Sequence, residues 1–431
     1  MNICNNKYID RQDRIHPDLR GDRPRAMPPR PDKAARTRCG HNVRPSPSSA
    51  PPCFRPFAMN LPLAPDTATH FVVWGALLIG LVLGAAGQAS RFCVRGAIAD
   101  WFIYGGRSRM MVWVLVVVVA ALGSQAVIGL TSFQPERTIA WSDRFLWSSY
   151  LAGGLLFGYG MVLAAGCPQR SLVKAGTGNL RAIVTLLVAA VTAQMTLRGV
   201  FAEGRVRTVD AWGLQLSGPQ DLGSLLAAWV PASAGALRTG VLLLLVTLAA
   251  AWLWRRRADL TLLDWSAGVL IGLLVPAAWL LTGLIGFLPE HPDTLEPAWQ
   301  GTQSRRPEAL TFIAPIAHGL DLLTYWTDKN ARLSFGVMLT AGVLLGSHLS
   351  ARARGEFRLE SFSNAAELRD HLLGGVLMGV GGVTAMGCSV GQGVTGLAML
   401  SAGAVLAVTG IAAGALLALK AQVRRADAAA G

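Results

Sequence analysis

The sequence predicts an all-α integral membrane protein with about nine transmembrane helices, re-entrant half-helices and an inverted internal repeat. The chain of 431 residues is 52% hydrophobic and only 15% charged. Many of its apolar runs reach about 20 residues, the length that crosses a hydrocarbon core of about 30 Å. Its 48 glycines suit closely packed helices, whereas a barrel would need strands of alternating polarity. A repeated glycine-rich block, described below, predicts the inverted arrangement.

The first 58 residues differ from the rest of the chain. They hold 12 basic and 5 acidic residues, and the difference of +7 is half of the formal net charge of +14. They are also rich in proline and arginine. No apolar run in this segment could pack into a core or serve as a signal sequence. We therefore expect residues 1–58 to be a disordered basic tail that results from an overlong start, with the natural start at Met59. The basic charge then gives no reason to expect nucleic-acid binding.

Residues 59–431 are expected to form a single transmembrane domain. Apolar runs that end at charged residues place its spans at 70–90, 111–130, 148–166, 180–200, 236–254, 264–288, 333–350, 371–387 and 396–420. A shorter run at 310–326 contains Pro315 and fits a re-entrant or interfacial piece. The segment 201–235 is expected to be an external loop.

Lysine and arginine in the short loops predict the orientation. Four basic segments fall on one side in a nine-span count, namely "GGRSRM", "WRRRADL", "ARARGEFR" and "KAQVRR". The positive-inside rule places that side in the cytoplasm. We therefore expect a multi-pass protein of the bacterial inner membrane, with the N-terminus outside and the C-terminus in the cytoplasm.

One glycine-rich block occurs twice. "GGLLFGYGMVLAAGC", residues 153–167, aligns without gaps on "GGVLMGVGGVTAMGC", residues 374–388. An odd number of spans separates the two copies, so they should cross the bilayer in opposite directions. Repeat halves at about 70–200 and 264–420 follow from this block. Membrane proteins built from inverted repeats commonly bind their substrate near the bilayer midplane, where the repeats meet.

Each copy ends in a Gly-Cys pair and then loses helical character. The pairs are Gly166–Cys167 and Gly387–Cys388, and the helix-breaking residues that follow are Pro168, Gly391, Gly393 and Gly396. A broken helix is tolerated in a membrane where protein or a water-filled cavity satisfies its backbone. The N-H groups that begin the next half-helix favour an anion. We expect an anion-binding seam here.

A thiol in such a seam favours a soft ligand. A hydroxyl would serve sulfate or phosphate better, whereas the polarisable sulfur of cysteine suits an anion with an exposed sulfur, or a soft cation such as Cu(I). Gln169 and Gln392 could donate amide hydrogens to sulfonate oxygens, or they could satisfy the broken backbone. Four basic residues near the cysteines could attract an anion, although such side chains usually extend to lipid headgroups. These are Arg91, Arg95, Arg170 and Lys174.

Three blocks around the cysteines of this domain resemble a known family. They are "FCVRGAIADW" at Cys93, "AAGCPQRSLVKAGTGNL" at Cys167 and "AMGCSVGQGVTGLAML" at Cys388. Over about residues 70–420 the chain resembles the YeeE/YedE family of membrane proteins, which includes bacterial thiosulfate-uptake proteins. The resemblance implies re-entrant half-helices and a central path in which these three cysteines pass thiosulfate along by S-H to sulfur contacts. It implies an inner-membrane permease surrounded by lipid, with a small cytosolic sulfur-carrier protein as a partner.

Two other functions fit the cysteines less well. A soft-metal transporter could use Met161 and Met386, but neither shares a helix face with its neighbouring cysteine. A membrane sulfurtransferase that forms a cysteine persulfide would need an activated thiolate, and no histidine adjoins any of the three. The chain has no CxxC pair, metal signature or ATP-binding P-loop, so we expect neither an enzyme nor a cofactor. Selenium and tellurium oxyanions fit the same soft-anion argument as thiosulfate.

Overall fold

The computed structural model describes residues 64–292, 294–328 and 332–430. The expectations for residues 1–58 lie outside this part of the chain. Its regular structure is almost entirely helical, which confirms the predicted class. The strands that it contains form two short antiparallel pairs: β1 (Arg144–Phe145) with β2 (Leu214–Gln215), and β3 (Phe287–Leu288) with β4 (Ala298–Trp299).

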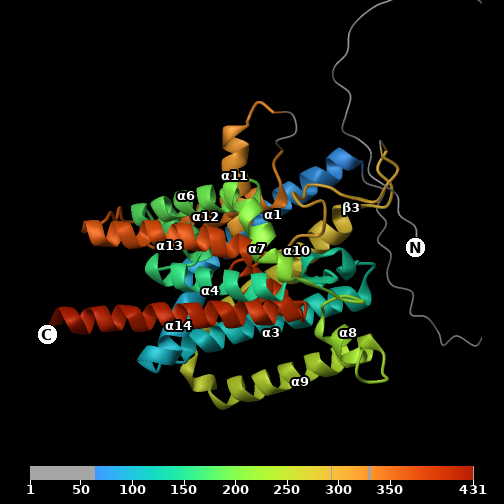
Figure 1. The fold of residues 1–431 in the computed structure, drawn as a ribbon, viewed down its shortest axis with the longest axis horizontal. Coiled ribbons are helices and arrows are strands. Elements are labelled where there is room, and N and C mark those ends of the chain that lie inside the picture. Colours follow the sequence, from blue (N-terminus) through green and yellow to red (C-terminus); the bar gives the residue numbers. More distant parts are fainter. Residues whose placement is uncertain (1–63, 293, 329–331, 431) are drawn as a thin grey trace, which may run out of the picture. The chain divides into compact units, whose positions relative to one another are not determined.

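Each of the predicted spans falls on a long helix, and these helices run roughly parallel or antiparallel to one another (Figure 1). They are α1 (Pro65–Ala89), α3 (Ser108–Leu130), α4 (Trp147–Leu163), α6 (Leu180–Leu197), α9 (Ala234–Arg255), α10 (Leu262–Leu280), α12 (Phe335–Ala353), α13 (Ala365–Thr384) and α14 (Ala402–Ala430).

Seven helical segments of the described residues are long and apolar enough to cross a membrane, two fewer than the nine spans expected. The difference lies in α12 and α13, which form helices at the expected places without meeting that measure. Their composition explains it, because α13 opens with charged residues and both helices carry glycines that add little hydropathy. Both helices bury those glycines against other helices instead of presenting a fully apolar surface.

Short elements connect the long helices. The α-helices are α2 (Val94–Ala99), α5 (Pro168–Gly176), α7 (Val200–Thr208), α8 (Leu222–Ala227) and α11 (Ile313–Thr324). The 3-10 turns are η2 (Pro135–Arg137), η3 (Ile139–Trp141), η4 (Asp210–Trp212) and η5 (Arg257–Asp259), and the π-helical turns are η1 (Asp100–Tyr104), η6 (Leu281–Ile285) and η7 (Gly391–Gly396). The run at 310–326 forms α11, too short to cross a bilayer. The segment 201–235, expected as a loop, contains α7 and α8.

Local sequence signals explain where several helices begin. Pro65 occupies the first turn of α1, where its missing N-H removes no helical hydrogen bond. Thr261 and Asp264 form a reciprocal capping box at the start of α10. The side chains of Asn179 and Asn364 accept backbone N-H groups at the starts of α6 and α13. Each cap satisfies donors that a helix N-terminus leaves unpaired.

Glycine contacts bring the long helices close together. Helix α1 packs along α12, and a Cβ on Gly80 would meet the Leu339 carbonyl oxygen. Helix α4 packs on both α13 and α14. Gly153 lies against Gly381, and Gly160 against Gly374, so α4 and α13 are antiparallel. Backbones approach this closely where a glycine leaves room at the contact, as at many helix interfaces in membranes.

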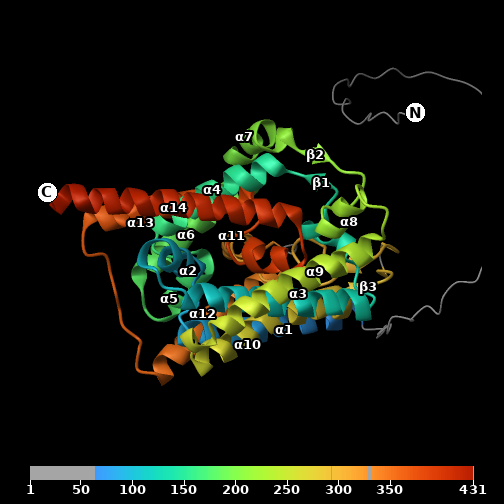
Figure 2. The same ribbon diagram turned by 90° about the horizontal axis from the view of Figure 1, so that it is seen from below.

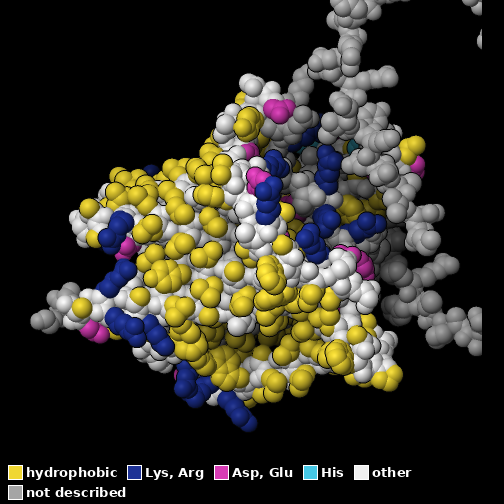
Figure 3. All heavy atoms as spheres, in the orientation of Figure 1, with side chains coloured by type: hydrophobic (Ala, Val, Ile, Leu, Met, Phe, Trp, Pro, Cys, Tyr) yellow, Lys and Arg dark blue, Asp and Glu magenta, His cyan; other side chains and the backbone are white. Residues whose placement is uncertain are grey.

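The outer surface suits a lipid environment. Apolar side chains cover a broad region between the helix ends, and lysine and arginine gather toward the ends (Figure 3). Helix α9 is the least buried of the seven candidate spans. Its exposed side chains include Leu243, Leu244, Leu245 and Leu248. Lipid chains can cover such a face without the cost of exposing it to water.

Candidate functional site

Each of the three cysteines begins a short helical segment. Cys93 is the N-cap residue of α2, and its Sγ accepts a hydrogen bond from the Gly96 N-H at 3.4 Å. Cys388 precedes η7, and its Sγ accepts from the Gly391 N-H at 3.4 Å. Cys167 is the N-cap residue of α5, although its thiol makes no capping hydrogen bond in the described part of the chain. All three thiols therefore lie at the N-terminal, electropositive end of a half-helix.

The same backbone turn precedes all three cysteines. Two residues before each thiol, the chain takes the left-handed conformation, with φ of 53° at Arg91, 52° at Ala165 and 55° at Met386. These are not residue types that favour this region, and the conformation costs about 1–2 kcal/mol at each of them. Such strain persists where the surrounding structure imposes it. No glycine or asparagine marks this turn, so residue preference does not predict it.

In the two repeated blocks the turn also has the same hydrogen bonds. The Gly166 N-H donates to the Met161 carbonyl, and the Gly387 N-H donates to the Gly382 carbonyl, both at 2.9 Å. A hydrogen bond that reaches back five residues across the end of a helix closes its last turn and satisfies a carbonyl that the helix leaves free. The two Gly-Cys pairs are thus presented by matching helix ends.

Cys167 occupies the centre of the cysteine cluster. The thiols of Cys93 and Cys388 both lie within electrostatic range of the Cys167 thiol. Cys167 and Cys388 are fully buried, whereas Cys93 is partly exposed. The structure therefore brings together three residues that are far apart in sequence. Ser389, which directly follows Cys388, is buried, and its hydroxyl has no hydrogen-bond partner in the described residues.

The two glutamines differ in their surroundings. The Gln392 amide donates to the Ala385 carbonyl at 2.8 Å, so it satisfies the broken backbone. Gln169 is 1% exposed, and neither its amide nitrogen nor its amide oxygen has a partner in the described part of the chain. An unsatisfied buried amide costs about 1–3 kcal/mol. Gln169 is therefore the glutamine whose hydrogen-bonding capacity is available to a ligand.

The loop glycines have different environments. A Cβ on Gly391 would lie 2.8 Å from the Thr311 hydroxyl oxygen, so this position needs a glycine for close approach. A Cβ on Gly393 would make only ordinary contact with Trp113, and one on Gly166 would likewise fit. Gly387 lies tightly against the Gln392 side chain. The structure therefore gives a steric reason for Gly391 and Gly387, and none for Gly393 or Gly166.

Two cavities adjoin the cysteine cluster. The larger has a volume of about 520 Å³ and is lined by Cys93, by six lysine or arginine residues and by residues of α5 and α6. Figure 2 shows α2 and α5 next to each other in this region. We call it the basic cavity. The basic residues that line it are Arg91, Arg95, Arg109, Arg170, Lys174 and Arg181.

The smaller cavity has a volume of about 90 Å³ and lies beside the Cys388 turn. Met386, Gly391 and Gln392 line one side, and Trp279 and Glu308 line the other. Trp279 is 3% exposed, and its indole N-H has no partner in the described residues. We call this the small cavity. Neither Trp279 nor Glu308 was identified from the sequence, because only folding brings them near the cysteine.

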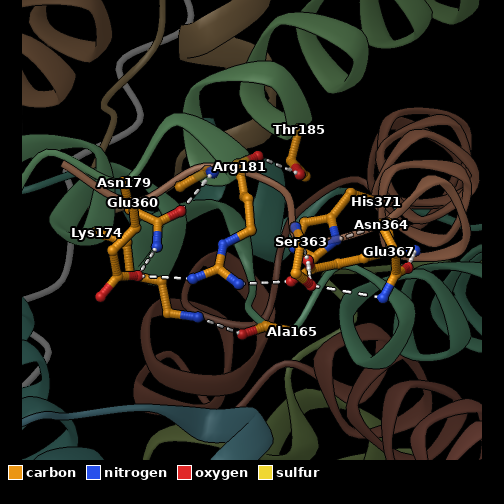
Figure 4. Close-up of polar contacts among 11 residues, drawn as sticks. Ala165, Lys174, Asn179, Arg181, Thr185, Glu360, Ser363, Asn364, Glu367 and His371 are labelled. Atoms are coloured by element: carbon orange, nitrogen blue, oxygen red, sulfur yellow. Dashed lines mark hydrogen bonds and ion pairs between the residues drawn. The ribbon is translucent and has the colours of Figure 1, made fainter.

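An ion-pair network borders the basic cavity (Figure 4). The Arg181 guanidinium contacts Glu360 at 2.7 Å and Glu367 at 2.5 Å. Asn179 donates to the same Glu360 carboxylate. Because Glu360 lies between α12 and α13, this network ties that connection to the start of α6.

Comparison with known proteins places the chain in a family. A family model described as Sulphur transport matches residues 89–417, which include all three cysteines. The chain is 28% identical over 342 residues to the thiosulfate transporter TsuA of Escherichia coli, covering 77% of this chain and 89% of that protein. It is 24% identical over 358 residues to the thiosulfate transporter TsuA of Spirochaeta thermophila, covering 78% of this chain and 94% of that protein. Together with its apolar helices, these matches confirm the resemblance stated above: the chain is a multi-pass membrane protein that belongs to the Sulphur transport family.

Proposed function

We propose that this protein is a permease that imports thiosulfate across the bacterial inner membrane along a path lined by Cys388, Cys167 and Cys93. The observation that carries the proposal is the position of Cys167, whose thiol interacts with both other thiols. The small cavity is lined by Met386 and Gly391, which flank Cys388 in the chain, and the basic cavity is lined by Cys93. A substrate could therefore pass from one cavity to the other through the thiol cluster. The names of the two TsuA relatives support thiosulfate as the substrate.

The orientation is part of the proposal. Arginines at the ends of α9 and α12 and the basic loop before α3 share the side of the basic cavity in a nine-span count, and the positive-inside rule assigns that side to the cytoplasm. The small cavity then faces outward, and the C-terminus is cytoplasmic. A small cytosolic sulfur-carrier protein, implied by the family resemblance, would receive the imported sulfur compound on the side of the basic cavity.

The inverted repeat also belongs to the proposal, and the glycine contacts support it. The sequence alignment equates Gly153 with Gly374 and Gly160 with Gly381. In the structure Gly153 contacts Gly381, and Gly160 contacts Gly374. Exchanging the two copies of the repeat therefore turns one contact into the other. A twofold relation between antiparallel copies produces this pattern.

The chemistry of the path follows from neutral thiols. The terminal sulfur of thiosulfate is soft and matches the polarisable S-H groups, while its sulfonate oxygens accept hydrogen bonds from the half-helix N-termini and from the Gln169 amide. Each contact is weak, and weak sequential sites allow a substrate to leave as readily as it enters. No covalent step is needed. Selenium analogues of thiosulfate fit the same contacts.

Uptake of labelled thiosulfate into proteoliposomes tests the proposal. Cys167→Ala and Cys388→Ala should each abolish uptake, while Cys53→Ser in the N-terminal segment, a matched removal of a thiol, should leave it unchanged. External sulfate should compete poorly, because it lacks the soft sulfur. Full uptake by both alanine variants would rule out the thiol path. Mass spectrometry for a cysteine persulfide after thiosulfate exposure separates the sulfurtransferase alternative, and Cu(I) uptake separates the soft-metal alternative.

A further inference from the structure

Four cations of the basic cavity have no carboxylate partner. In the described residues, Arg91, Arg95, Arg170 and Lys174 take part in no ion pair. Arg170 donates to the Gly87 carbonyl at 3.3 Å, and Lys174 to the Ala165 carbonyl at 2.8 Å. The Arg95 Nε is buried and has no hydrogen-bond partner within the part of the chain that the structure describes. These backbone carbonyls accept hydrogen bonds from only a few of the N-H donors of the four side chains, and they neutralise none of the positive charge.

The carboxylates of the same cavity do not balance its cations, because Glu356, Glu360 and Glu367 face six lysine or arginine residues. Glu360 and Glu367 both pair with Arg181. Glu356 accepts a hydrogen bond from Gln88 at 2.6 Å. The remaining cations lie close enough to interact electrostatically, as Lys174 does with Arg170 and Arg95. Like charges gathered in a partly buried space repel one another, and a bound anion is the species that relieves this repulsion.

The cations continue from the thiol cluster into the cavity. Helix α5 starts at Cys167, and Arg170 and Lys174 lie four residues apart on it, one turn after another. Arg170 interacts electrostatically with both Cys93 and Cys167. A volume of about 520 Å³ is in the range of sites for whole small molecules, so it exceeds what a single thiosulfate fills. The cavity is therefore larger and more basic than a passage alone requires.

We propose that the basic cavity is a second anion-binding site, which recognises negative charge and oxygen and does not require a sulfur atom. Guanidinium and ammonium groups bind the oxygens of sulfate, phosphate and thiosulfate alike. Its place at the exit of the path rests on the proposed function, but its ligand class does not. Selection for thiosulfate then falls to the buried thiols Cys167 and Cys388. Hard oxyanions on the side of the basic cavity occupy this site and compete there with thiosulfate that leaves Cys93.

Cys93 provides the readout, because it is the cysteine of the cluster that lines this cavity and is partly exposed. The full-length protein carrying Cys4→Ser, Cys39→Ser and Cys53→Ser is purified in detergent and treated with methanethiosulfonate reagents of opposite charge. Mass spectrometry measures the labelling rate of the Cys93 peptide. This rate is divided by the rate at which the same reagent reacts with a free thiol. The anionic sulfonatoethyl reagent should react about tenfold faster than the cationic trimethylammonium reagent, and sulfate should slow the labelling saturably.

A charge-matched pair of variants locates the effect. Arg170→Gln with Lys174→Gln should weaken sulfate protection about tenfold or more, since each lost cation removes a charge-assisted hydrogen bond. Arg107→Gln with Arg369→Gln removes the same charge from residues that do not line the cavity, and it should leave protection unchanged. If the first pair does not fold, Arg91→Gln with Arg95→Gln replaces it with the same expected result.

The outcomes distinguish this site from the proposed function. Equal rates for the two reagents on the parent protein, or no protection by sulfate, would overturn the second site, even if thiosulfate uptake were normal. Loss of thiosulfate uptake specificity with intact sulfate protection would instead remove the proposed function and leave the anion site in place. Protection that falls equally in both charge-matched pairs would show a general surface effect and would also overturn the site.

Discussion

Gly160 of α4 lies against Gly374 of α13, and a Cβ on Gly160 would come within 2.8 Å of the Gly374 carbonyl oxygen. The contact joins the two glycine-rich blocks, each of which ends in the cysteine that its helix presents. A backbone oxygen cannot turn aside as a side chain can. The separation of α4 and α13 therefore depends on the absence of side chains at this crossing, and so does the position of both Gly-Cys turns.

Gly374→Val should destabilise the protein by separating these helices. Overpacking of a tight contact costs about 1–3 kcal/mol, and a backbone partner places this site at the upper end. Thermal unfolding in detergent, followed by size-exclusion chromatography, measures the loss. Gly240→Val on α9 is the matched control, because no atom of the described residues lies within 4 Å of a Cβ there. Equal melting temperatures for the two variants would contradict this account of the crossing.

Gln169→Leu should impair transport without lowering stability. Its amide has no partner in the described residues, so leucine removes a buried unsatisfied group while about preserving volume. Loss of hydrogen bonds to the sulfonate oxygens should raise the KM for thiosulfate uptake about tenfold. Uptake kinetics and melting temperature are measured together.

Gln392→Leu serves as the comparison, because this variant should lower the stability of the protein. It removes the hydrogen bond to the Ala385 carbonyl, and the buried carbonyl left behind costs about 1–3 kcal/mol. The melting temperature should therefore fall. An unchanged KM in Gln169→Leu, or a destabilisation equal to that of Gln392→Leu, would show that Gln169 has only a packing role.

The sequence predicted the helical membrane fold well, for physical reasons that differ from those behind the features that it did not predict. Apolar run length reports directly on helices in a membrane, and a duplicated block reports on paired positions. The left-handed turns at Arg91, Ala165 and Met386 escaped prediction because tertiary packing, and not residue preference, imposes them. The different roles of Gln169 and Gln392 also escaped prediction, because they depend on the hydrogen-bond partners that the fold brings to each side chain. The net charge of the basic cavity likewise depends on which of its arginines pair with carboxylates in the folded protein.

Glu367→Gln should weaken the network at the basic cavity in a pH-dependent way. Hydrogen bonds from the backbone N-H and hydroxyl of Ser363, together with the Arg181 guanidinium, lower the pKa of Glu367 to about 2 from its ordinary 4.5. The folded state therefore prefers the ionised carboxylate. The stabilisation is fully present above about pH 4.5 and is lost as the pH falls toward about 2. The difference in melting temperature between parent and variant should accordingly shrink across that range.

The exposed pair of Glu203 with Arg207 supplies the control for this measurement. Its two side chains are largely exposed on α7, and such pairs contribute about 0–1 kcal/mol. Glu203→Gln should change the melting temperature little at any pH. A Glu367→Gln variant that behaved in the same way would show that the network does not hold the connection between α12 and α13.

Glu308 should give thiosulfate uptake a pH dependence. Burial raises the pKa of its carboxyl above the ordinary value, against opposing hydrogen bonds from Ser304. Because Glu308 lines the small cavity, its ionised form repels an entering dianion and its protonated form does not. The KM for uptake should therefore fall as the pH is lowered through the raised pKa. Glu308→Gln, which is neutral at every pH, should show the low KM throughout, while Glu290→Gln at an exposed site should keep the parent profile. A parent KM that is independent of pH, or a profile that survives in Glu308→Gln, would exclude the small cavity as the point of entry, because a dianion passing this carboxyl cannot be indifferent to its charge.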